Sequence, residues 1–132
     1  EDYSEFKNRA WLVNDPALFE FEIKDATKKY NLYYNVRNSL DYPWQRIFIQ
    51  YQLADSSGTL LTKKLVSNYL FEKSGKPIGR SGLGDVHDNQ FLLLENYSFN
   101  REGIYRMKLE QLNQQDTLAG ILAVGFRIEA AQ

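Results

Sequence analysis

Apolar and polar residues alternate along three early segments of the chain, with the two-residue period of a half-buried β-strand. In segment 19–23, FEFEI, three apolar side chains alternate with two glutamates. Segments 30–37, YNLYYNVR, and 46–53, RIFIQYQL, continue the alternation over longer stretches. The pattern predicts that each strand buries one face. In the two longer strands the residues expected to face inward are Tyr30, Leu32, Tyr34, Val36, Ile47, Ile49, Tyr51 and Leu53.

The later segments show this period less regularly. Segments 59–71, TLLTKKLVSNYLF, and 89–99, NQFLLLENYSF, are rich in β-branched, leucine and aromatic residues and are predicted to be strands. Segment 120–129, GILAVGFRIE, is predicted to be the closing strand. Its expected inward residues are Leu122, Val124, Phe126 and Ile128, with Gly125 and Arg127 facing outward.

Segment 104–112, IYRMKLEQL, fits two structures. Tyr105, Met107 and Leu109 alternate as in a strand, whereas Leu109 and Leu112 also have helical spacing. Gly103 and the strand-like neighbouring segments favour a strand.

Turn-forming residues separate these segments, as in NSLDYP at 38–43, ADSSG at 54–58 and REG at 101–103. Short strands without alternating helices predict an all-β fold, an antiparallel β-sandwich of jelly-roll or Ig-like type. We expect one sandwich domain over residues 17–132. Residues 1–16 are expected to form a loosely docked N-terminal arm, anchored by Trp11, Leu12 and Val13.

Composition narrows the possible functions. The 132 residues are 43% hydrophobic and 25% charged, which is typical of a globular domain with its own core. Sixteen Lys and Arg against seventeen Asp and Glu give a net charge of -1, so nucleic acid is not an expected partner. The absence of cysteine excludes disulfides, thiolate metal sites and a cysteine nucleophile within these residues.

The glycine-rich stretch 75–89, GKPIGRSGLGDVHDN, lacks the known phosphate-binding motifs. Gly79 and Gly84 have the spacing of a P-loop, but Asp85 and Val86 occupy its lysine and hydroxyl positions. A dinucleotide-binding loop would require a third glycine at the position of His87, followed by a helix. The stretch is therefore expected to be a shaped turn.

Asp85, His87 and Asp88 carry side chains that could hold a transition metal or transfer protons. One histidine without cysteine cannot complete a zinc site within the chain. The favoured interpretation is structural, with Asp85, Asp88 and Asn89 as turn and cap formers and glycines at positive φ. We predict no catalytic residue, cofactor or metal; a hydrolase using His87 is the weaker alternative.

Arg37 and Arg127 lie on the polar sides of their predicted strands. A surface role is expected for both, and either could pair with Asp85 or Asp88 and so pin the loop.

Tyr42, Trp44 and Phe48 form a cluster of aromatic residues along the chain. Such residues are enriched at interfaces, so an aromatic platform for a sugar or a protein is one hypothesis, and coverage by a neighbouring loop is the other.

Three segments, YNLYYNVRNSLDYPWQRIFI, GLGDVHDN and LAGILAVGFRIE, resemble the hallmark segments of the GldH family, lipoproteins associated with gliding motility in Bacteroidetes. They occur in the same order, and the resemblance covers most of residues 11–129. The matching motif residues are Arg37, Asn38, Asp41, Tyr42, Pro43, Gly84, Asp85, Asp88, Asn89, Gly125 and Arg127.

The resemblance implies a non-catalytic lipoprotein, attached to the outer membrane through a lipid-modified cysteine upstream of Glu1. Envelope proteins of the gliding and type IX secretion apparatus are the implied partners. The alternative hypothesis is a glycan-binding module of the cell envelope. The candidate interaction or loop-shaping residues are Arg37, Asp41, Tyr42, Trp44, Asp85, His87, Asp88, Asn89 and Arg127.

Overall fold

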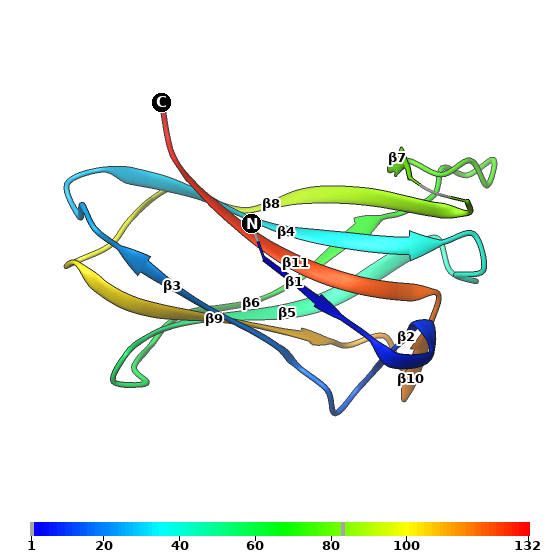
Figure 1. Ribbon diagram of the computed structural model, residues 1–132, viewed down its shortest axis with the longest axis horizontal. Coiled ribbons are helices and arrows are strands. Elements are labelled where there is room, and N and C mark those ends of the chain that lie inside the picture. Colours follow the sequence, from blue (N-terminus) through cyan, green and yellow to red (C-terminus); the bar gives the residue numbers. More distant parts are fainter. Residues whose placement is uncertain (1, 83) are drawn as a thin grey trace.

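The computed structural model describes residues 2–82 and 84–132, in which two large sheets pack face to face and two short strands form a third sheet (Figure 1). One large sheet has the strand order β1-β11-β4-β8-β7 and the other the order β3-β9-β5-β6. Neighbouring strands are antiparallel throughout both sheets. The predicted all-β antiparallel sandwich is therefore confirmed.

The first sheet contains β1 (Asp2–Glu5), β4 (Lys29–Ser39), β7 (Arg80–Ser81), β8 (Val86–Ser98) and β11 (Ile121–Ala130). The second contains β3 (Ala17–Ile23), β5 (Arg46–Asp55), β6 (Leu60–Tyr69) and β9 (Gly103–Gln111). A 3-10 turn, η1 (Lys7–Arg9), leads into β2 (Ala10–Leu12), which pairs with β10 (Thr117–Ala119) at one end of the sandwich.

The core lies between the two sheets. The alternation predicted for β5 is confirmed, because all four of its expected inward side chains are buried. Phe126 of β11 packs against Phe19 and Phe21 of β3, with ring centroids 6.0 and 5.0 Å apart. Tyr34 of β4 donates a hydrogen bond of 2.6 Å to Asn68 Oδ1 of β6, and burial raises the pKa of its phenol. Aromatic packing and this hydrogen bond thus join the sheets.

The ambiguous segment 104–112 is mostly strand β9, which ends at Gln111. It pairs with β3 on one side and β5 on the other, and Met107 and Leu109 are fully buried. Backbone pairing on both edges suits the alternating pattern better than helical spacing does.

The predicted alternation fails at one position of β11. Leu122 was expected to face inward, but the pairing of β11 with β4 shifts register between Ile121 and Ala123. The bulge places one extra residue in β11, so Leu122 is half-buried whereas Ile121 and Val124 are fully buried.

The N-terminal residues contribute strands to the sheets. β1 pairs with β11 at the edge of the five-stranded sheet. Trp11 is completely buried and stacks on Phe6, with ring centroids 5.1 Å apart, whereas Leu12 and Val13 are exposed. Trp11 is therefore the anchoring side chain of this segment, and the division at residue 16 stays a prediction.

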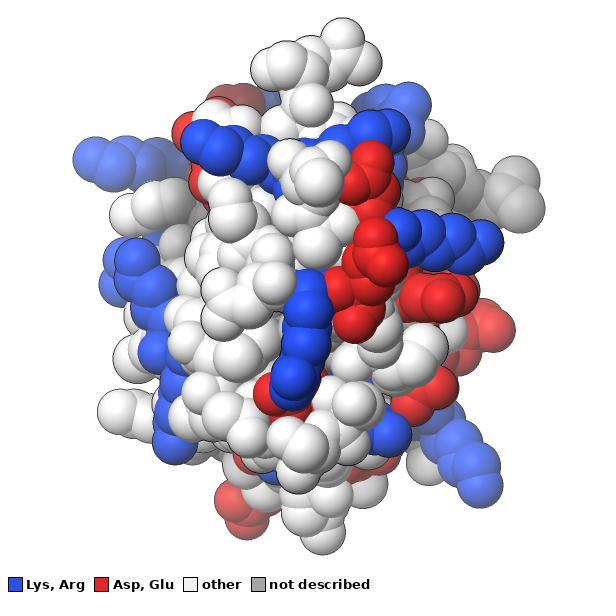
Figure 2. All heavy atoms as spheres, turned by 90° about the vertical axis from the view of Figure 1, so that its left-hand side faces the viewer, with Lys and Arg blue, Asp and Glu red and all other residues white. Residues whose placement is uncertain are grey.

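The end of the sandwich that carries the β3–β4, β5–β6 and β8–β9 turns has charges of both signs interspersed with uncharged surface (Figure 2). No single sign dominates this face. In the described residues, no helix is long and apolar enough to cross a membrane.

Candidate functional site

The outer surface of the five-stranded sheet carries a row of polar residues, here called the polar face: Tyr3, Asn35, Arg37, Asp88 and Gln90. Arg37 Nε donates a hydrogen bond of 2.9 Å to Asp88 Oδ1, and its guanidinium lies 4.8 Å from the centre of the Tyr3 ring. The hydrogen bond to Asp88 is the main reason why the pKa of Arg37 is raised. The predicted pairing of Arg37 with Asp88 is confirmed.

Gly125 allows the first strand to lie against this face. It pairs with Tyr3 on one side and Asn35 on the other. A Cβ atom on Gly125 would lie 2.6 Å from the backbone oxygen of Asp2 and 3.0 Å from the Tyr3 ring. Gly125 faces outward as predicted, and it is buried because β1 covers it.

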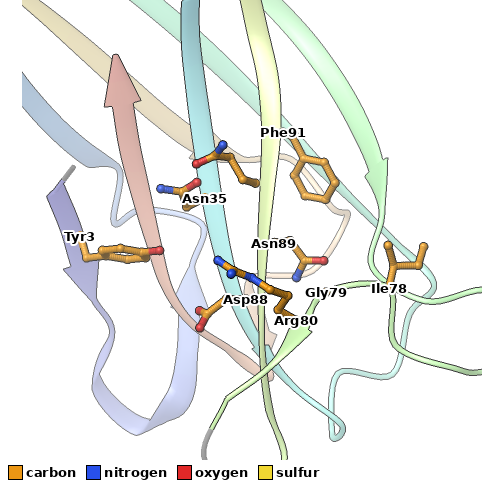
Figure 3. A pocket seen from close by; sticks show the side chains of 9 residues that line it. Tyr3, Asn35, Ile78, Gly79, Arg80, Asp88, Asn89 and Phe91 are labelled. Atoms are coloured by element: carbon orange, nitrogen blue, oxygen red, sulfur yellow. The ribbon is translucent and has the colours of Figure 1, made fainter. Parts of the chain in front are cut away.

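A small pocket of about 270 Å³ lies beside the polar face, next to β7 (Figure 3). Arg80 of β7 extends back over the sheet, between Asp88 and Asn35. The pocket has these polar residues on one side and the apolar side chains of Ile78 and Phe91 on the other. Its lining consists of Tyr3, Asn35, Ile78, Gly79, Arg80, Asp88, Asn89, Gln90 and Phe91.

Asp88 and Asn89 are strand residues of β8, so the prediction that they form a turn is wrong. Asn89 lies on the opposite side of the sheet from Asp88 and is buried. Its amide donates hydrogen bonds to Asn38 Oδ1 at 2.8 Å and to the Val36 carbonyl at 3.2 Å. These partners on β4 stabilise an extended backbone in a segment whose composition favours turns.

Glycine has two roles in the stretch 75–89. Gly75 and Gly84 have positive φ angles of 89° and 64°, as predicted for turn positions. Gly79 permits a close approach instead, because a Cβ there would lie 2.6 Å from Asn89 Oδ1.

The structure does not bring Asp85, His87 and Asp88 together as one chemical site. Asp85 pairs with Arg9 at 3.3 Å and Asp88 pairs with Arg37, while His87 Nδ1 is buried without a hydrogen-bond partner among the described residues. Within those residues no cluster of three His, Cys, Asp or Glu could hold a metal ion.

Arg127 also lies on the outer side of the five-stranded sheet. Its guanidinium pairs with Glu129, contacts Gln90 Oε1 at 3.5 Å, and lies 5.5 Å from the centre of the Tyr33 ring. It therefore has its carboxylate partner on its own strand, and the suggested pairing of Arg127 with Asp85 or Asp88 is wrong.

A second candidate surface lies on the outer side of the four-stranded sheet. We call it the aromatic groove, formed by Trp44, Arg46, Phe48, Leu65, Tyr69 and Leu112, with a volume of about 750 Å³. Trp44, Leu65 and Tyr69 have exposed fractions of 49, 54 and 50%. Four amide side chains complete its lining, from Gln45, Asn113, Gln114 and Gln115.

The loop that follows β9 forms a fixed wall of this groove. Leu112 N donates to the Phe48 carbonyl at 3.0 Å. Asn113 accepts a hydrogen bond from Phe48 N and donates one to Phe48 O, both at 2.8 Å. Gln111 holds the far end of the loop through a 2.8 Å hydrogen bond to the Gln115 carbonyl. The groove is thus formed before any partner binds.

The predicted platform of Tyr42, Trp44 and Phe48 is wrong in one member. Tyr42 is only 3% exposed, and its hydroxyl donates to the Arg46 carbonyl at 2.7 Å. Burial raises the pKa of this phenol. Tyr42 fits because Gly120 has no side chain: a Cβ on Gly120 would lie 2.6 Å from Tyr42 Cα.

The other predicted residues next to Tyr42 in the sequence are Asp41 and Trp44. Asp41 is exposed, with its backbone N–H donating to Ser39 Oγ at 3.2 Å. Trp44 lies in the aromatic groove. Sequence reasoning missed four groove residues, which are Arg46, Leu65, Tyr69 and Leu112.

The fold and these surfaces define a small antiparallel β-sandwich with one internally paired polar face and one open aromatic groove. A family model described as "GldH lipoprotein" matches residues 1–128. The chain therefore belongs to the GldH lipoprotein family.

Two curated relatives cover nearly the whole chain. This chain is 30% identical over 138 residues to "Gliding motility lipoprotein GldH homolog" of Christiangramia forsetii, and the match covers 96% of this chain and 82% of that protein. It is 28% identical over 136 residues to "Gliding motility lipoprotein GldH" of Flavobacterium johnsoniae, covering 96% and 83%.

Proposed function

We propose that this chain is a lipid-anchored, non-catalytic protein of the cell envelope that acts by binding other proteins. Its proposed setting is the gliding or type IX secretion machinery, as an accessory or assembly component. The family match and the names of the two relatives support the lipoprotein and motility parts of this proposal.

The observation that carries the binding role is the aromatic groove. Apolar and aromatic side chains from three separate segments gather there, and three of them are about half exposed: Trp44, Leu65 and Tyr69. Large exposed apolar patches on folded proteins are typical of binding surfaces, and aromatic residues with arginine are enriched at protein interfaces. Burial of these side chains by a partner would supply the main favourable free energy of binding.

The proposed anchor is a lipid-modified cysteine that precedes residue 1, with attachment to the outer membrane. Its support is the lipoprotein description of the family. Two acyl chains would hold the domain stably at the membrane, which a single chain would not.

The test uses the full-length precursor in its native organism. Cells would be labelled with an alkyne palmitate analogue, and the protein followed through membrane fractionation. Secretion of type IX cargo would be measured in a deletion strain complemented with wild type, His87→Ala or Leu65→Ser. We expect a labelled outer-membrane protein, full rescue by His87→Ala and weak rescue by Leu65→Ser.

Two outcomes would contradict the proposal. One concerns the anchored role in secretion: an unlabelled protein in the soluble fraction would contradict the anchor, and normal secretion in the deletion strain would contradict the role in secretion. The other is loss of function in a folded His87→Ala variant, which would return the hydrolase alternative. Circular dichroism of each purified variant separates these results from misfolding.

A further inference from the structure

Among the described residues, three arginines lie over aromatic rings. Arg37 lies 4.8 Å from the Tyr3 ring centre and Arg127 lies 5.5 Å from that of Tyr33. Arg46 is placed against two rings, 4.9 Å from Phe48 and 5.4 Å from Tyr69. The same cation–π arrangement therefore occurs on both outer surfaces of the sandwich.

The three guanidinium groups differ in their anionic partners. Arg37 has Asp88 at 2.9 Å, and Arg127 is paired with Glu129. Within the part of the chain that the structure describes, Arg46 has no carboxylate partner. The described lining of the aromatic groove contains no Asp or Glu at all. Arg46 thus brings an uncompensated positive charge to an apolar surface.

The position of Arg46 over two rings bears on which ligand suits it. A guanidinium held against aromatic rings keeps its N–H donors free around the edge of its plane. A carboxylate matches that edge, because its two oxygens can accept two parallel hydrogen bonds. Exclusion of water by the surrounding side chains would strengthen the pair. The position that Asp88 fills for Arg37 is therefore left for a carboxylate from another molecule.

The same arrangement disfavours a glycan in the groove. Sugar rings bind aromatic side chains through their faces, and Arg46 lies over the faces of both Phe48 and Tyr69. Tyr42, the third member of the predicted platform, is buried. Of the three residues of the predicted platform, only Trp44 is exposed without Arg46 over its ring.

We propose that the aromatic groove binds a segment of a partner protein in which one Asp or Glu is flanked by apolar residues. The partner's carboxylate pairs with the edge of Arg46, and its apolar side chains cover Trp44, Leu65 and Leu112. This inference rests on the proposed function as a protein-binding component, and it specifies the chemistry of the partner.

The test uses two pools of synthetic heptapeptides added to the ¹⁵N-labelled protein. Both pools have Leu, Ile or Phe flanking the centre; one has Asp or Glu there, and the other Asn or Gln. NMR follows the indole N–H of Trp44, with buried Trp11 as an internal reference for the fold. We expect shifts at Trp44, Phe48 and Leu65, and affinity at least about tenfold higher for the acidic pool.

Variants separate the charge from its stacked geometry. Arg46→Met should abolish the preference for the acidic pool. Arg46→Lys keeps the charge but removes the planar fork, so it should lose most of that preference. Arg127→Met is the matched control, because Arg127 also lies over a ring but already has Glu129. This control should bind as wild type does.

Equal affinity for the two pools, or an unchanged preference in Arg46→Met, would overturn the inference. Shifts confined to residues outside the groove, or glycan binding at Trp44, would also overturn it. So would shifts that grow with protein concentration in the absence of peptide, because they would indicate a second copy of the chain in the groove. Each of these results leaves lipid labelling and the secretion phenotype untouched. Failure of the inference is thereby distinguishable from failure of the proposed function.

Discussion

Similar residues have different roles on the two outer surfaces of the sandwich. On the polar face, Arg37 lies over Tyr3 and pairs with Asp88, so both its charge and its ring contact are satisfied within the chain. In the aromatic groove, Arg46 has ring contacts but no carboxylate among the described residues, and Leu65 remains exposed. The first surface stabilises the fold through contacts within the chain, whereas the second has exposed side chains to which we propose that a partner binds.

This difference predicts two kinds of mutational effect. Changes on the polar face should lower the free energy of unfolding, because they remove contacts made within the folded chain. Changes in the groove should leave stability almost unchanged and weaken binding. Measuring the free energy of unfolding and the binding affinity of the same variants therefore tests whether the two surfaces differ in this way.

The largest loss of stability is expected for Gly125→Leu. The new side chain would collide with the Asp2 backbone and the Tyr3 ring, forcing β1 away from β11. We expect the free energy of unfolding to fall by about 2 kcal/mol, as for other overpacked sites. Urea denaturation checks this value, and Ala130→Leu at an exposed position of the same strand is the control. Equal midpoints for the two variants would contradict the role given to Gly125.

Arg37→Met should have a smaller effect. The substitution leaves Asp88 without its partner and removes the cation from the Tyr3 ring. Because about a third of each charged side chain is exposed, solvent screening limits the expected loss to about 1 kcal/mol. Urea denaturation at low and high salt measures it. A variant as stable as wild type at low salt would show that the Arg37–Asp88 pair does not stabilise the fold.

Asp55, the last residue of β5 before the β5–β6 turn, belongs to neither surface and serves as a reference site. Hydrogen bonds from the Ser57 hydroxyl and from nearby backbone N–H groups lower the pKa of this carboxyl below 3.8. Its contribution to stability is therefore present above about pH 4 and is lost as the pH falls through the lower folded-state pKa. Unfolding of wild type and Asp55→Asn should differ at pH 6 and converge near pH 2. A difference independent of pH would contradict this assignment.

The smallest change in stability is expected in the groove. Leu65→Ser removes an exposed side chain and should alter the free energy of unfolding by less than about 0.5 kcal/mol. The same substitution should weaken binding of the acidic peptide pool about tenfold, because it removes apolar contact area. Thermal unfolding and NMR titration measure the two effects. A destabilised Leu65→Ser variant with intact binding would reverse the comparison between the surfaces.

The strands could be predicted because their side chains alternate, as in β5, where inward and outward residues follow the sequence pattern. The course of segment 85–89 could not. Asp88 and Asn89 favour turns locally, but hydrogen bonds with Arg37 and Asn38 of β4 hold them in an extended strand. Such long-range pairing overrides the local preference.

The groove was harder to predict because its residues come from separate parts of the chain. Trp44 and Phe48 were visible as aromatic residues, whereas Leu65 lies in a segment with irregular alternation. Phe48 offered one signal, since it is an aromatic side chain on the polar side of a regular strand. The burial of Tyr42 depends on the backbone near Gly120, which no local pattern indicates.

We propose that the outer side of the four-stranded sheet binds a partner at the aromatic groove. This proposal is tested most directly by placing a photo-crosslinking amino acid at Leu65 or at Leu18 in the full-length protein in native cells. Both leucines are exposed on this sheet, by 54 and 67%, but Leu18 lies on β3, away from the groove. We expect a cross-link to one defined envelope protein from position 65 and none from position 18. No product from position 65, or the same products from both, would contradict it.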